Sequence, residues 1–160
     1  MKTTLLTFGL LLAGFTCFSQ DTQENGTIYI KHPYIEVVNN AIKAYLAKDD
    51  AANREIYSDT ARFWVSGWTK PIGRDAAIKM WDSDFDYYDN ITLVPVGYPD
   101  YLHYLDQDTK VVQSWWIWSG TSKKTGETVK IRMVQFDQFN DAGKITFESI
   151  FGDFSKMVKD

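Results

Sequence analysis

Residues 111–151 decide the fold, with the sequence VVQSWWIWSGTSKKTGETVKIRMVQFDQFNDAGKITFESIF. Apolar side chains recur at every second position in three parts of this stretch, a pattern typical of β-strands that bury one face. The connections between these parts are short and contain Gly126 and Gly143, so we expect the strands to pair antiparallel in sequence order. The three predicted strands are residues 111–120, 128–139 and 145–151.

Helices are predicted upstream of these strands, where apolar residues recur at spacings of three and four. The first begins at Pro33, the second is capped by Asp49 or Asp50, and the third opens after Gly73. Two further short strands are predicted, at residues 61–66 and 91–96. The order α-α-β-α-β-β-β-β predicts an α+β domain in which about three helices of the N-terminal half pack against one face of a curved antiparallel sheet.

The N-terminus has the pattern of a secretory signal peptide. Lys2 precedes an uncharged apolar run at residues 5–15, and small side chains lie three residues and one residue before Gln20. We therefore predict that residues 1–19 are a signal peptide. A membrane anchor is disfavoured because the run has 11 residues, short of the roughly 20 that span a bilayer.

Export to the periplasm or the extracellular space follows from this assignment. Lipid attachment to Cys17 is a less favoured route, because Phe15 and Thr16 are larger than the residues expected before a lipidated cysteine. The predicted organisation is a signal peptide (1–19), a flexible leader (20–32) and one domain (33–160).

Composition excludes several classes of function. The 17 basic and 21 acidic side chains give a net charge of −4, which offers no basic surface for nucleic acid. The only cysteine, Cys17, is removed with the signal peptide, so no disulfide is expected. No His-rich metal motif and no phosphate-binding Gly-rich loop occurs, and we predict neither a metal nor a cofactor. Beyond the signal peptide no segment has the pattern of a membrane span.

An acidic run in the third helix has the spacing of a calcium loop. It consists of Asp82, Asp84 and Asp86, but Tyr87 stands where such a loop needs Gly and Leu93 where it needs Glu. We interpret the run as solvated charge on the helix surface.

Three short motifs resemble the nuclear transport factor 2-like superfamily across the predicted domain. They are YSDTA at residues 57–61, GRDAAI at 73–78 and FNDAGKI at 139–145. This superfamily includes the SnoaL-like polyketide cyclases, the steroid Δ-isomerases and the limonene epoxide hydrolases. The resemblance implies a cone-shaped α+β fold, an apolar cavity inside the cone and frequent dimerisation, here in an exported bacterial member. It indicates fold more strongly than function.

The resemblance also assigns positions for known chemistry. The general-base Asp of the steroid isomerases corresponds to Val65, the oxyanion-hole Asp to Gln135 and its partner Tyr to Ile42. The Asp and the neighbouring Arg of the epoxide hydrolases correspond to Ile150 and Ser149. Both sets of acid–base groups are therefore absent at the matching positions.

Strand parity predicts which side chains face the interior. Odd-numbered residues of 128–139 face inward, because Lys130 and Arg132 require solvent. Pairing with the preceding strand then places Trp116 and Trp118 beside Met133 and Ile131, with Ser114 near Gln135. We predict an apolar cavity lined by Tyr57, Trp64, Trp81, Trp116, Trp118, Met133, Gln135 and Asp137.

Asp137 is the weak catalytic candidate among these residues, because a carboxylate among inward-facing apolar side chains must be paired, solvated or protonated. Three functions stay open. The leading one is an exported domain that binds a small apolar or amphipathic molecule without established catalysis. The alternatives are a cofactor-independent isomerase, cyclase or lyase with Asp137 as base and Gln135 or Tyr57 as hydrogen-bond donor, and a homodimeric protein-interaction module.

Overall fold

The computed structural model describes residues 23–157. The predicted signal peptide, residues 1–19 with Cys17, lies outside these residues. Within the described part of the chain, no helix is both long and apolar enough to cross a membrane.

The described residues form three helices and eight strands. The helices are α1 (Pro33–Ala47), α2 (Asp50–Ile56) and α3 (Arg74–Tyr87). The strands are β1 (Ile28–Tyr29), β2 (Tyr57–Val65), β3 (Ile72–Gly73), β4 (Tyr88–Pro95), β5 (Asp100–Tyr104), β6 (Thr109–Ser122), β7 (Thr128–Phe139) and β8 (Ile145–Gly152). The predicted α+β class is confirmed.

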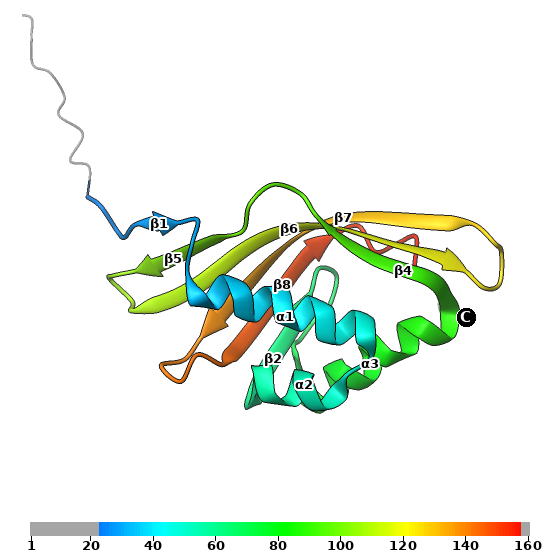
Figure 1. Cartoon of the computed structure of the whole chain (residues 1–160), viewed down its shortest axis with the longest axis horizontal. Helices are drawn as coiled ribbons and strands as arrows, with labels where there is room; N and C mark the ends of the chain where they lie inside the picture. The colour runs from blue at the N-terminus through cyan, green and yellow to red at the C-terminus, as the bar shows by residue number, and fades with distance from the viewer. Residues whose placement is uncertain (1–22, 158–160) are drawn as a thin grey trace, which may run out of the picture.

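All eight strands belong to one curved, unclosed sheet, and the helices lie along one of its faces (Figure 1). The strand order is β1-β5-β6-β7-β8-β2-β3. Strand β4 also pairs with β6, at residues 116–122, whereas β5 pairs with residues 109–113 of the same strand. Neighbours pair antiparallel except for β2 and β8, which are parallel. The first long strand therefore lies beside the last strand of the chain.

Side-chain caps fix where helices α1 and α2 begin. Pro33 occupies the first turn of α1, and the Nδ1 atom of His32 accepts a hydrogen bond from the backbone N–H of Tyr34 at 3.2 Å. The His32 ring also stacks on the Tyr101 ring of β5, with centroids 3.6 Å apart. Asp49 caps α2 as predicted, because its Oδ1 accepts from the N–H of Ala52 at 2.9 Å.

The register of β6 and β7 agrees with the sequence prediction. Trp116 lies opposite Met133, Trp118 opposite Ile131, and Ser114 opposite Gln135. Ile131, Gln135, Asp137 and Phe139 are buried on the helix-facing side, whereas Lys130 and Arg132 are exposed. The inner face of the sheet is thus the face that the parity argument selects.

Other elements differ from the prediction in their extent. The strand predicted at 61–66 begins at Tyr57, directly after α2. Strands β1, β3 and β5 are additional. Within the stretch predicted to be a flexible leader, β1 pairs antiparallel with β5, Ile28 opposite Leu102 and Tyr29 opposite Tyr101. Strands of two to five residues are too short for their alternation to be recognised in the sequence.

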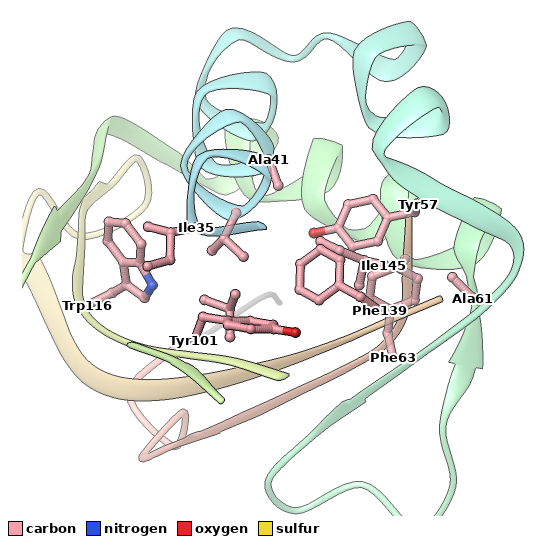
Figure 2. Packing of buried hydrophobic residues seen from close by; sticks show 12 residues of the cluster. Ile35, Ala41, Tyr57, Ala61, Phe63, Tyr101, Trp116, Phe139 and Ile145 are labelled. Carbon is pink, nitrogen blue, oxygen red and sulfur yellow. The ribbon is translucent and has the colours of Figure 1, made fainter. Parts of the chain in front are cut away.

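The main core fills the space between α1 and the inner face of the sheet (Figure 2). It contains Ile35 and Ala41 of α1, Phe63 of β2 and Phe139 of β7. A smaller cluster of Tyr88, Trp118 and Ile131 packs beside it. The two clusters border the cavity described below.

Apolar side chains also gather on the outer face of the sheet. Trp115, Val134 and Phe151 are cross-strand neighbours on β6, β7 and β8. The centroid of the Phe151 ring lies 5.1 Å from that of Trp64 and 5.9 Å from that of Phe136, and Phe151 is 44% exposed. We call these five residues the outer patch.

Candidate functional site

A cavity of about 390 Å³ lies between helices α1 and α3 and the inner face of the sheet. Its walls are mainly apolar and aromatic, and they include Trp68, Trp81, Leu93, Met133 and Phe154. Apart from the tryptophans, five lining residues have polar side-chain atoms: Tyr45, Tyr57, Asp84, Gln135 and Glu148. Among the described residues, no Lys, Arg or His lines the cavity.

Most of the residues predicted to line a cavity surround this one. They are Tyr57, Trp81, Trp118, Met133 and Gln135. Asp137 is fully buried behind the wall, where it contacts Gln135.

Two predicted lining residues lie elsewhere. Trp64 is on the outer face, because Phe63 before it points into the core and successive residues of a strand point to opposite sides. Trp116 faces inward but is packed into the core, where its Nε1 donates to Ser114 Oγ at 2.8 Å. In Figure 2 it lies at the opposite end of the cluster from Tyr57.

A pair of buried carboxyl groups is the main polar feature of the cavity wall. Asp137 of β7 and Glu148 of β8 are directly opposite each other in the antiparallel ladder. The Tyr57 hydroxyl donates to Glu148 Oε2 at 2.7 Å. Gln135 Nε2 donates to both oxygens of Asp137, at 3.1 and 2.9 Å, and to Glu148 Oε2 at 3.2 Å.

Burial controls the protonation of this pair. Desolvation raises the pKa of Glu148 to about 7, although hydrogen bonds from Tyr57 and Asp137 oppose the rise. Desolvation and then the charge of Glu148 raise the pKa of Asp137 well above its usual range. Burial therefore favours the protonated form of both carboxyl groups, which titrate as a pair, and Glu148 is the member that lines the cavity.

Tyr57 is held firmly beside the pair. It is the first residue of β2, immediately after α2, and its ring packs against Phe63 and Trp81, with centroids 4.9 and 5.6 Å away. Figure 2 shows its hydroxyl directed into the interior beneath α1. Burial and the charge of Glu148 raise the pKa of Tyr57, so the phenol stays neutral and donates.

Glu148 is the residue that sequence reasoning missed. The sequence did contain a signal for it. Glu148 lies two residues before Ile150, the position matched to the Asp of the epoxide hydrolases, and residues two apart on a strand share a face. A register shift between Gln138 and Phe139 makes the pairing of β7 with β8 hard to count from the turn.

A second polar group lies in the same cavity, formed by Tyr45 of α1, Asp84 of α3 and Trp118 of β6. The Tyr45 hydroxyl donates to Asp84 Oδ2 at 2.9 Å, and Trp118 Nε1 donates to the Tyr45 hydroxyl, also at 2.9 Å. We call these three residues the Asp84 cluster.

The Asp84 cluster corrects the interpretation of the acidic run as solvated charge. Asp84 is only 7% exposed, because its side of α3 faces the sheet, while Asp86 is exposed. No group of three or more His, Cys, Asp or Glu side chains that could hold a metal ion occurs in residues 23–157.

The family follows from comparison with known proteins. The sequence model of the SnoaL-like domain matches residues 38–148, which include most of the helices and strands around the cavity. The chain belongs to the SnoaL-like family. No curated protein matches this SnoaL-like chain significantly.

Solved structures share the fold of this SnoaL-like domain at low identity. IdmH of Streptomyces antibioticus, a proposed polyketide cyclase, has a TM-score of 0.65 and 16% identity, covering 79% of this chain and 96% of its own. A proposed isomerase from Bacillus subtilis has a TM-score of 0.57 and 19% identity, covering 74% and 84%. SalBIII, an epoxide hydrolase/cyclase-like enzyme of pyran ring formation in salinomycin, has a TM-score of 0.62 and 20% identity, covering 76% and 92%.

Four of the five positions matched to known catalytic residues of the superfamily line the cavity of this SnoaL-like domain. Ile42, Val65, Gln135 and Ile150 all line it, whereas Ser149 does not. Three of these four positions are apolar here. The carboxyl groups that line this cavity are instead those of Glu148 and Asp84, at positions to which the resemblance assigns no role.

Proposed function

We propose that this SnoaL-like domain catalyses cofactor-independent proton transfer on a neutral apolar or amphipathic molecule held in the cavity. The observation that carries the proposal is the Asp137–Glu148 pair, with Glu148 on the cavity wall and bonded to Tyr57. This develops the acid–base alternative considered from the sequence, with Glu148 rather than Asp137 facing the ligand. The descriptions of IdmH and SalBIII as cyclase-type proteins support the choice of reaction class.

Glu148 has the properties of a general base. A group with a pKa of about 7 gains and loses a proton readily at neutral pH. As a carboxylate it takes a proton from a carbon beside a ligand carbonyl, and the electrons of the C–H bond form an enolate. Where a C=C bond is conjugated with the enolate, Glu148 returns the proton at the far carbon of that bond and gives an isomer. Attack of the enolate carbon on a second carbonyl of the molecule instead closes a ring, and the alkoxide formed takes the proton from Glu148.

Asp137, Gln135 and Tyr57 are positioning residues in this scheme. Gln135 bonds both carboxyl groups, and Tyr57 fixes one oxygen of Glu148. These contacts hold the base in one orientation before the ligand arrives, which lowers the reorganisation needed during the reaction. The apolar walls strengthen the effect by limiting water near the charge.

We extend the proposal to the setting of the reaction. The signal-peptide pattern of residues 1–19 supports activity in the periplasm or outside the cell. The outer patch and the dimerisation implied by the superfamily resemblance support a homodimer that joins two sheets by their outer faces.

Exchange of ligand protons with solvent deuterium tests the proposed chemistry. The protein is incubated in D2O with a panel of neutral bicyclic ketones, and deuterium uptake beside the carbonyl is followed by mass spectrometry. We expect at least one ketone to exchange, and Glu148→Gln to slow that exchange by about 100-fold or more. Glu127→Gln is the matched control, because Glu127 is exposed on the β6–β7 connection.

Binding is measured in the same samples by quenching of tryptophan emission. Ketones that bind wild type without exchange would contradict proton transfer and favour a binding domain. Equal rates of deuterium exchange in wild type and Glu148→Gln would show that Glu148 is not the base.

A further inference from the structure

We infer that residues 153–157, which follow β8, form a strap across the cavity, and that a ligand enters and leaves when this strap swings away about Gly152. In Figure 1 the strap is the red coil that continues from the arrow of β8. The inference goes beyond the proposed chemistry, since it concerns how the cavity is reached. It rests on the proposed function only for the idea that the cavity takes up a small molecule.

The strap is a wall of the cavity that is one chain thick. Phe154 and Met157 line the cavity, and both pack against the smaller core cluster. Beside and between them, Asp153, Ser155 and Lys156 are exposed. One side of the strap therefore faces the cavity and the other faces solvent, so only this segment of the described chain separates the two at this place.

Hydrogen bonds shape the strap but do not fasten it to the rest of the domain. The N–H and the hydroxyl group of Ser155 donate to Asp153 Oδ1, at 3.1 and 2.6 Å. The N–H of Met157 donates to the C=O of Phe154 at 3.0 Å. Within residues 23–157, no hydrogen bond or ion pair joins the strap to another element. Apolar contacts of two side chains keep it closed, and a segment with so few attachments opens at a lower cost than a strand of the sheet.

Gly152 is a fixed point at the start of the strap. It is the last residue of β8 and lies opposite Met133 of β7. The Ser66 hydroxyl donates to the C=O of Gly152 at 2.7 Å and accepts from its N–H at 3.1 Å. A Cβ at this position would lie 3.1 Å from the Arg132 carbonyl oxygen, so glycine permits the close approach of β7. The firmly bonded chain ends at Gly152, and hinges commonly lie at such ends of elements.

A gate and a simple wall contact have different effects on binding kinetics. Loss of a contact with the bound ligand weakens the complex and speeds dissociation alone. Loss of a gate speeds association and dissociation together, because the ligand passes the same barrier in both directions, and the affinity changes little. Where the open form is at most about a tenth of the population, permanent opening raises both rates by about tenfold or more.

Stopped-flow quenching of tryptophan emission by 2-acetylnaphthalene, a neutral bicyclic ketone, measures the two rates. We expect Phe154→Ala/Met157→Ala to raise both rates by about tenfold and to change the dissociation constant by less than about threefold. Met157→Ala alone is a milder change that serves if the double variant does not fold, and it should raise both rates by about threefold. Lys156→Ala, on the exposed side of the strap, is the matched control and should match wild type.

Access to the cavity is also measured without a ligand. Ala41 of α1 is buried and lines the cavity, so the thiol introduced by Ala41→Cys reports the entry of N-ethylmaleimide. Labelling is followed by mass spectrometry on the peptide that carries residue 41, which excludes Cys17. Ala44→Cys on the same helix is the matched control, because Ala44 is buried outside the cavity lining and reports unfolding. We expect Phe154→Ala/Met157→Ala to speed labelling at residue 41 by about tenfold relative to residue 44.

Two results would overturn the inference. Faster dissociation with an unchanged association rate would make Phe154 and Met157 ordinary wall contacts. Equal labelling at residue 41 with and without these two side chains, relative to residue 44, would show that the strap does not close the cavity, and this result decides the question even where 2-acetylnaphthalene does not bind. Neither readout involves proton transfer, so a protein that exchanges no ketone proton would contradict the proposed reaction and not the strap.

Discussion

Glu148 is a carboxyl group whose burial favours the protonated form, and this has a consequence for stability. Its pKa rises from 4.5 to about 7 on folding, so between these values the folded state holds a proton that the unfolded chain releases. The free energy of unfolding therefore falls as pH rises through this range. At higher pH the folded protein contains a buried negative charge.

Replacement of Glu148 by Gln should remove this penalty. We expect Glu148→Gln to be more stable than wild type at about pH 8, by on the order of 2–3 kcal/mol, and similar to wild type at about pH 4. Urea unfolding at the two pH values measures the difference, and the control Glu127→Gln, which keeps Glu148, should match wild type at both. A variant less stable than wild type at both values would contradict the pKa assigned to Glu148.

The start of helix α1 depends on a histidine that must be neutral. His32 Nδ1 caps the helix by accepting from Tyr34, and burial lowers the pKa of His32 below 6.5. Below pH 6.5 the unfolded chain binds a proton that the folded state resists, so the contribution of His32 to stability is present above this pH and is lost as pH falls. Protonation of Nδ1 also removes the cap.

The His32 cap can be tested by substitution. We expect His32→Ala to lower the free energy of unfolding by about 1 kcal/mol at about pH 7.5, and to lose less stability than wild type on acidification to about pH 5.5. His103→Ala, on β5, is the matched control. A larger acid-induced loss in His32→Ala than in wild type would rule out the proposed role of the neutral ring.

The sequence could predict elements with strong alternation and clear turns, but not those without them. The register of β6 and β7 followed from period-two patterning and the turn at Gly126, and the burial of Gln135 and Asp137 followed from that register. Strand β5 was missed because it is short. Helical spacing alone did not reveal which face of α3 meets the sheet, so the burial of Asp84 was also missed.

The candidate site was predictable to the extent that it lies on those strands. Glu148 lies on β8, where a register shift obscures the facing of its residues. Trp116 lies on the inner face, as predicted. It packs with residues of α1 in the core and does not line the cavity. The extent of a cavity along the inner face depends on where the helices cover the sheet. The alternation of residues along a strand carries no information about the position of those helices.

The outer patch predicts that two copies of the domain associate through it. We expect the domain to sediment as a dimer and Phe151→Lys to sediment as a monomer, because the new charge lies at the centre of the patch. Tyr98→Lys is the control, since Tyr98 is 80% exposed and lies outside the patch. Analytical ultracentrifugation decides between the two states. A wild-type domain that stays monomeric at about 100 μM would exclude this interface as a stable one.

The parallel pairing of β2 with β8 determines when the site can form. The side chains of Tyr57 and Glu148 are hydrogen-bonded across 91 positions of the sequence, and β8 leaves the ribosome after the other strands of residues 23–157. A chain that is still being synthesised carries the phenol without the carboxylate. The contact between Tyr57 and Glu148 is therefore a long-range one that needs β8, so a chain that ends before β8 lacks the pair to which we assign proton transfer.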